Sequence, residues 1–111
     1  MRHLARALAA AIALAPLAAA AEVDAKAVFL ENCAKCHGDD GTASTELGTK
    51  YMAQDFTDPD FKKEFNPDKA KKVITHGVKK TKMKAWKGVL SKEEIDALSK
   101  FVMQFPEKKG Q

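Results

Sequence analysis

The sequence predicts a small all-α domain with long loops between its helices. Prolines that follow Asp58 and Asn66 stand where two helices begin, and Ser91 with Glu94 forms a capping box ahead of a third helix. Apolar residues after this box recur at helical spacing. No run of alternating apolar and polar residues indicates a strand, and no internal repeat is visible.

The first helix is expected to begin after Asp24, whose side chain is a suitable N-cap. Val23 before the cap and Val28 at the fourth helical position form a hydrophobic staple. Phe29 then offers a ring to a partner helix. From 38 to 50 the chain is rich in Gly, Thr, Ser and Asp without any period, so we expect a loop there.

Two helices opened by proline follow this loop. The shorter begins at Pro59 and carries Phe61 and Phe65 on one face, whereas the longer begins at Pro67 and stops at Gly77. The inward positions of the longer helix are Ala70, Val73 and Ile74. The last helix follows the Ser91 box and ends at Pro106. Its apolar positions are Ile95, Leu98, Phe101, Val102 and Phe105.

The N-terminus has the pattern of a secretory signal over residues 1–21. Arg2 and Arg6 supply a positive start, residues 7–17 are apolar, and the alanines that follow suit cleavage near Ala20 or Ala21. A retained anchor is the alternative, but the apolar run is shorter than the roughly 20 residues that span a bilayer. We therefore expect an exported periplasmic protein without stable membrane insertion.

Charge and arginine content argue against nucleic acid as a partner. Without Arg2 and Arg6, residues 22–111 carry 17 Lys against 15 Asp and Glu, which leaves a net charge of +2. This part of the chain also has no arginine for bidentate contacts to phosphates or bases.

Both cysteines of the chain lie in the stretch Cys33-Ala34-Lys35-Cys36-His37. A zinc site needs about four ligands, yet the only other histidine after the signal is His76. A redox dithiol usually occurs in a βαβ setting, which the sequence lacks. A structural disulfide is a further alternative. The C-x-x-C-H spacing favours covalent attachment of haem, in which both thiols add to the vinyl groups and His37 binds the iron. Export agrees with this chemistry.

With this motif, the chain resembles the class I c-type cytochromes from Asp24 to about Phe105. Phe29 stands four residues before the first cysteine, and Leu98 with Phe101 matches the pair on the family's last helix. The resemblance implies an all-α cytochrome c fold in residues 22–111, with crossing N- and C-terminal helices. Short helices and loops would wrap one covalently bound haem c.

The resemblance also implies a methionine as the second iron ligand, on a loop before the last helix. The stretch MKAWKGVLSKEE begins at Met83 and has this layout, with Lys84 in place of the family's proline. His37 and Met83 are therefore the expected axial ligands, a pair that raises the reduction potential. Met52, Met103 and His76 are the rivals for the sixth position. We expect both rival methionines to be packing residues.

Three further expectations concern the surroundings of the haem. The family's proline after the haem motif is absent here, so a backbone carbonyl within residues 38–51 is expected to orient His37. Tyr51 and Trp86 are candidates to bind the propionates, or are simply packing aromatics. Lysines around Met83 would steer acidic redox partners, unless they are only a solvated loop. They are Lys79, Lys80, Lys82, Lys84 and Lys87, and Lys35 lies inside the motif.

The function expected from these residues is a monomeric, non-enzymatic carrier of single electrons between redox proteins. An iron closed by two protein ligands has no free position for a substrate. One alternative is a haem with an open or labile sixth site, which would sense or react with a gas or peroxide. Another is a subunit that passes electrons to one fixed enzyme.

Overall fold

The computed structural model describes residues 9–12 and 22–109. Most of the expected signal, residues 1–21, therefore lies outside the described residues. Within the described part the secondary structure is helical, and its one β-bridge joins Lys87 to Leu90. The helices are α1 (Ala25–Asn32), α2 (Ala34–His37), α3 (Glu46–Tyr51), α4 (Pro59–Glu64), α5 (Pro67–His76), α6 (Lys92–Phe101) and the 3₁₀ helix η1 (Val102–Gln104). The all-α prediction is confirmed.

Helices α1, α4, α5 and α6 begin where the sequence predicts. The Asp24 carboxylate accepts a hydrogen bond from the Ala27 amide and caps α1. Pro59 and Pro67 are the first residues of α4 and α5, and the reciprocal capping box of Ser91 with Glu94 opens α6. Each cap satisfies amides that have no partner within the helix.

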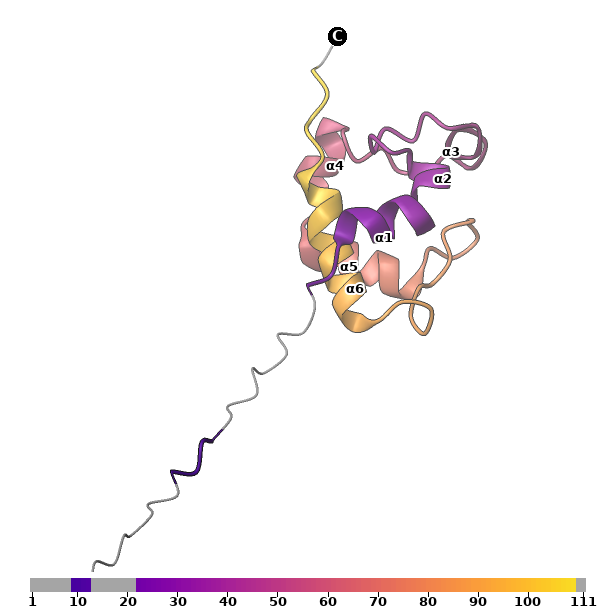
Figure 1. The fold of residues 1–111 in the computed structure, drawn as a ribbon. Helices are drawn as coiled ribbons and strands as arrows, with labels where there is room; N and C mark the ends of the chain where they lie inside the picture. Colours follow the sequence, from indigo (N-terminus) through magenta and orange to yellow (C-terminus); the bar gives the residue numbers. More distant parts are fainter. Residues whose placement is uncertain (1–8, 13–21, 110–111) are drawn as a thin grey trace, which may run out of the picture.

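The first and last helices cross, as Figure 1 shows, with α1 lying against α6. Phe29 of α1 is fully buried, and its ring centroid lies 5.2 Å from that of Phe101 and 5.3 Å from that of Phe105. Leu98 of α6 is 1% exposed in the same cluster. The predicted contact between the two helices is therefore confirmed.

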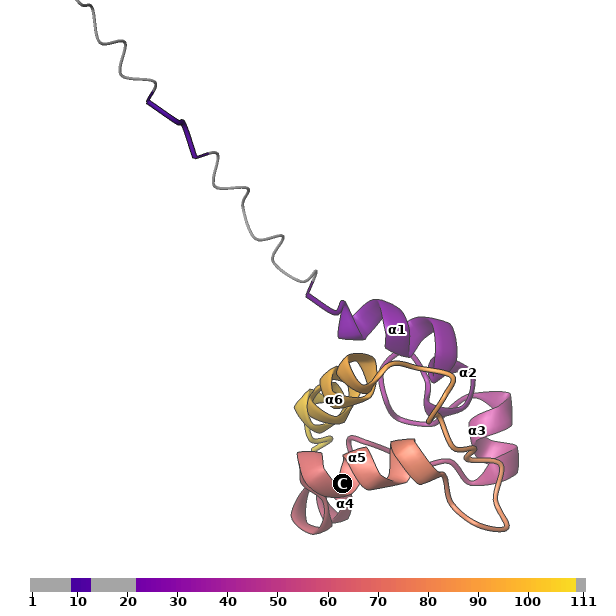
Figure 2. The same cartoon turned by 90° about the horizontal axis from the view of Figure 1, so that it is seen from below.

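The other helices complete a ring that is visible in Figure 2, where α5 lies across from α1 and α3 lies across from α6. Helix α5 packs against α6, and α2 packs against α3. Gly77 ends α5 with φ of 68°, a left-handed value that glycine adopts without strain.

The loop expected over 38–50 is only partly a loop, because α3 occupies its second half. The Thr45 hydroxyl caps α3 by accepting a hydrogen bond from the Gly48 amide. Helix α3 ends at Tyr51, and its C-cap, Met52, has left-handed backbone angles. The prediction of a continuous loop is wrong for residues 46–51, because their glycine and threonine content favours a loop although Thr45 caps a short helix there.

Candidate functional site

The cysteine stretch lies at the junction of two helices. Cys33 ends α1 and precedes α2, a single turn that holds Ala34 inside and carries Cys36 and His37. Both cysteines are half-buried free thiols. Burial and then the charge of Cys36 raise the pKa of Cys33 to about 11. The junction thus presents two free thiols and an imidazole within one short stretch.

The imidazole of His37 is fixed at its edge and at its face. Its Nδ1 lies 2.9 Å from the carbonyl oxygen of Gln54, to which it donates in the tautomer that leaves Nε2 unprotonated. The ring stacks on Phe56, with centroids 4.5 Å apart. Burial lowers the pKa of His37, opposed by the Gln54 hydrogen bond. A neutral ring with Nε2 free is the form that binds a metal.

Gln54 corrects the expectation that a carbonyl within 38–51 would orient His37. The chain continues through α3 before it returns to the imidazole, so the acceptor lies three residues beyond the expected range. Backbone acceptors carry no signal in residue type. The fold is needed to find this one.

Helix α3 packs against the short helix α2, which carries Cys36 and His37. The Thr45 hydroxyl, which caps α3, lies 2.7 Å from the Lys35 carbonyl and 3.1 Å from the Cys36 carbonyl. Gly48 faces the same backbone so closely that an added Cβ would collide with the carbonyl oxygens of Cys36 and Ala43. A glycine at this position lets α3 approach α2 without any side chain between them.

Met83 lies on a separate segment, which hydrogen bonds to the end of α5. The Val78 amide donates to the Met83 carbonyl at 2.9 Å, and the Trp86 amide donates to the Ile74 carbonyl at 2.9 Å. The Met83 amide in turn donates to the Thr81 hydroxyl. These bonds fix the backbone on both sides of Met83, whose side chain is half-buried.

The rivals of Met83 occupy different environments. Met103 lies in η1 and packs against the core, as predicted. His76 is the exposed last residue of α5. Met52 is 89% exposed, so the prediction that it is a packing residue is wrong for the chain in this structure. The cause is its position as the C-cap of α3, which directs it away from the core cluster.

Two lysines of the segment that contains Met83 lie close to aromatic rings. The five lysines predicted to surround Met83 are all exposed. Lys84 Nζ lies 4.3 Å from the ring centroid of Trp86, and Lys82 Nζ lies 5.8 Å from that of Tyr51. Tyr51, Lys80, Thr81 and Lys82 line a hollow of about 450 Å³. Trp86 is 9% exposed, whereas Tyr51 is half-buried.

The residues present fit a covalently held haem. Two free thiols and an imidazole with an available Nε2 come from one short stretch, and a thioether comes from the segment after α5. Within residues 9–12 and 22–109, no three His, Cys, Asp or Glu side chains form a group that could hold a metal ion. The described part also contains no helix long and apolar enough to cross a membrane.

Comparisons with known proteins agree with this site. Residues 20–102 match the sequence profile of the family described as cytochrome C oxidase, cbb3-type, subunit III. The cbb3-type cytochrome c oxidase subunit FixPc of Rhizobium leguminosarum bv. viciae is 36% identical over 80 residues, which are 69% of this chain. The chain spans only 25% of that relative.

Solved structures support the fold. The KustC0563 c-type cytochrome has a TM-score of 0.70 and 29% identity, over 77% of this chain and all of that chain. The reducing HAO-like protein complex Kustc0457/Kustc0458 of Kuenenia stuttgartiensis has a TM-score of 0.59 and 20% identity, over 78% of this chain and 47% of that chain. The second likeness concerns the fold alone.

Proposed function

The chain belongs to the family of cytochrome c oxidase, cbb3-type, subunit III, and is a c-type cytochrome with a role in electron transfer, so we propose that it is a soluble periplasmic carrier of single electrons. The signal in residues 1–21 would be cleaved, and residues 22–111 would hold one haem c. The orientation of His37 by Gln54 is the observation that carries this proposal.

Cys33 and Cys36 are the proposed points of covalent attachment. His37 and Met83 are the proposed axial ligands. The Gln54 carbonyl would hold the imidazole through Nδ1 and leave Nε2 free to bind iron. When bound, haem supplies a one-electron couple between ferric and ferrous iron. Closure of the sixth position by Met83 would exclude water and small ligands, which suits a carrier rather than an enzyme.

Docking is assigned to the exposed lysines that flank Met83. They are Lys79, Lys80, Lys82, Lys84 and Lys87. Their clustering beside one proposed iron ligand would bring acidic donors and acceptors to the haem edge in turn. The carrier would act as a monomer.

The test is a pair of spectra from the full chain, expressed in a host that attaches c-type haem. Wild type should show covalent haem and the weak far-red band of sulfur bound to ferric iron. Met83→Ala should lose this band, whereas Met52→Ala should keep it because Met52 is exposed. A high-spin wild type would favour the sensor or reactor with an open sixth site. Absence of covalent haem would overturn the whole assignment.

A second candidate is a subunit that passes electrons to one fixed oxidase. The family description and the name of the FixPc relative favour it. Gel filtration of periplasmic and membrane extracts separates the two candidates. A free carrier elutes at its own mass, whereas a fixed subunit elutes with an oxidase.

A further inference from the structure

The segment after η1 turns back onto the domain. Phe105 packs between the first helix and the loop after α3, with its ring centroid 5.3 Å from that of Phe29 and 5.9 Å from that of Phe56. Three residues later the Lys108 amide donates a 2.9 Å hydrogen bond to the Thr57 carbonyl. We call residues 105–108 the C-terminal strap. It lies beyond the region that matches the family profile, which ends at 102.

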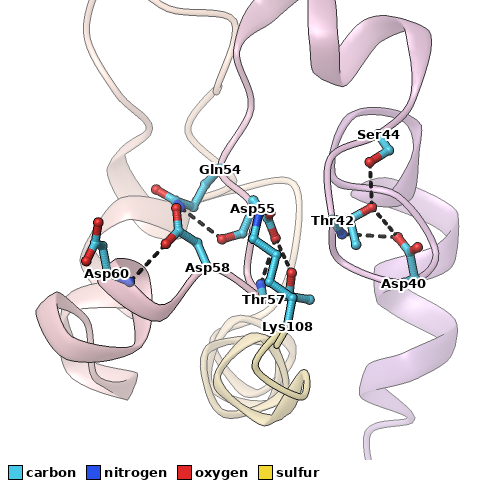
Figure 3. Close-up of polar contacts among 9 residues, drawn as sticks. All are labelled: Asp40, Thr42, Ser44, Gln54, Asp55, Thr57, Asp58, Asp60 and Lys108. Atoms are coloured by element: carbon cyan, nitrogen blue, oxygen red, sulfur yellow. Dashed lines mark hydrogen bonds and ion pairs between the residues drawn. The ribbon is translucent and has the colours of Figure 1, made fainter. Parts of the chain in front are cut away.

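The strap is tied to one short turn, residues 54–57, as Figure 3 shows. Lys108 Nζ lies 3.0 Å from Asp55 Oδ2. The other carboxylate oxygen, Oδ1, accepts from the Thr57 amide at 2.8 Å and from its hydroxyl at 2.6 Å. Thr57 is 5% exposed. Lys108 therefore binds the turn twice, through its backbone and through its ammonium group.

The same turn holds His37. Gln54, just before Asp55, accepts the hydrogen bond from the imidazole Nδ1, and Phe56, just after Asp55, stacks on the imidazole face. The Phe56 amide also donates to the Gly41 carbonyl at 2.8 Å, which joins the turn to the loop that follows His37 in the chain. Any rotation of the turn would move the edge and the face contacts of His37 together.

We propose that the C-terminal strap fixes the 54–57 turn and thereby the imidazole of His37, with Lys108 and Asp55 as positioning residues. This inference rests on the proposed role of His37 as an iron ligand. The strap acts through contacts already made in the protein. The strap would restrict rotation of the His37 ring and maintain the hydrogen bond between His37 Nδ1 and the Gln54 carbonyl.

Two other carboxylates lie near this ion pair. The hydrogen bond and charge of Asp55 are the main causes of the raised pKa of Lys108, and the charge of Asp58 is a smaller one. The charge of Asp55 also acts to raise the pKa of Asp40, against the hydrogen bonds that lower it. Neither the Asp58 nor the Asp40 carboxylate hydrogen bonds to Lys108. As Figure 3 shows, the side chain of Lys108 binds the turn through Asp55. Asp55 is thus the acidic residue to change.

The test uses nitrogen-15 NMR of the ferrous holoprotein. The readout is the exchange rate of the His37 Nδ1 proton with water, compared with the exchange of the Leu98 amide in the core. Lys108→Ala should speed exchange of the ring proton about threefold, the scale of one partly exposed ion pair, and leave Leu98 unchanged. Truncation after Pro106 also removes the Thr57 contact and should speed it about tenfold.

Matched variants decide the outcome. Lys109→Ala removes the neighbouring lysine, which makes no ion pair in the described residues, and should match wild type. Lys108→Arg keeps the ion pair and should also match it. Lys108→Ala added to Asp55→Asn should have no further effect, because both substitutions remove the same ion pair between Lys108 and Asp55. Equal ring exchange in wild type, Lys108→Ala and the truncated chain overturns the inference.

The proposed function fails in a different way. If His37→Ala retains the spectrum of the wild-type holoprotein, His37 is not the ligand and the proposed function is wrong. If His37 is the ligand but its ring proton does not respond to the strap, only the inference is wrong. A parallel increase at Leu98 and His37 would show global unfolding, which also contradicts a local positioning role.

Discussion

The ring centroids of Phe29 and Phe101 lie 5.2 Å apart, with their planes tilted by 48°. This pair connects α1, at the start of the described domain, to α6, near its end, although the two helices lie far apart in the sequence. Cys33 follows Phe29 by one helical turn, and its amide donates to the Phe29 carbonyl. The contact between α1 and α6 therefore also fixes where the haem motif begins.

Phe29→Ala is expected to lower the free energy of unfolding by about 3–5 kcal/mol, the usual cost of deleting a buried phenylalanine. The ring is fully buried and meets three other phenylalanines. Denaturant unfolding of the holoprotein measures the change. Leu30→Ala is the control, because Leu30 is on the same helix and is 41% exposed. Equal losses in the two variants would contradict this account of the core.

Gly48→Ala is expected to destabilise the protein although alanine is the better helix former. Its Cβ would collide with the Cys36 and Ala43 carbonyls, so α3 must move away from α2. We expect a lower thermal midpoint and a smaller yield of attached haem. Thr49→Ala changes the next, exposed position of the same helix and should match wild type. A stabilised Gly48→Ala protein would mean that α3 does not press on the haem motif.

The sequence predicted the elements whose signals are local. Capping side chains and helix-starting prolines lie within four residues of the amides they affect, so α1, α4, α5 and α6 were all found. Helix α3 was missed although Thr45 caps it and Glu46 stands in its first turn. Six residues give too little periodicity to outweigh a composition that favours loops.

The proposed haem motif can be predicted from the sequence because its chemistry requires fixed residue types at fixed spacing. The contacts that hold this motif in place cannot be predicted in the same way. The Gln54 acceptor is a backbone carbonyl, and every residue has one. Asp55 and Lys108 are 53 positions apart, so their pairing depends on how the strap returns after η1. Contacts of this range follow from the tertiary fold rather than from a local pattern.

Charge reversal beside Met83 is expected to slow electron transfer to an anionic complex. Lys80→Glu or Lys82→Glu should lower the second-order rate with ferricyanide by roughly threefold at low salt, and less at high salt. With hexaammineruthenium, a cation, the change should have the opposite sign. Stopped-flow oxidation and reduction measure both rates.

Lys26→Glu is the control for these variants, since Lys26 is an exposed residue of α1 and has the same change in net charge. A similar effect from Lys26→Glu would show that only net charge matters. The lysines beside Met83 would then have no special place in docking.

Acid is expected to remove the stabilisation that Asp55 provides. Burial raises the pKa of Asp55, but hydrogen bonds from Thr57 and Lys108 outweigh it, and the folded pKa lies below the usual value. A carboxylate with a depressed pKa stabilises the fold fully above its unfolded pKa of about 3.9, and this contribution is lost as the pH falls through the folded value. The loss therefore belongs below about pH 4.

The comparison that isolates this effect is wild type against Asp55→Asn. Asp40 and Asp96 also have depressed pKa values, from hydrogen bonds with Thr42 and with Lys100, and they make both proteins sensitive to acid. The contribution of Asp96 cancels in the difference between the two unfolding free energies, measured by denaturant at each pH. The pKa of Asp40 responds to the charge of Asp55, so both proteins also carry Asp40→Asn, which removes its contribution. This difference should be constant from pH 6 to pH 8 and should shrink below about pH 4. Parallel curves down to about pH 3 would mean that the Asp55 carboxylate has the same pKa in the folded and unfolded chains, and that the strap is held by the Lys108 backbone bond to Thr57 instead.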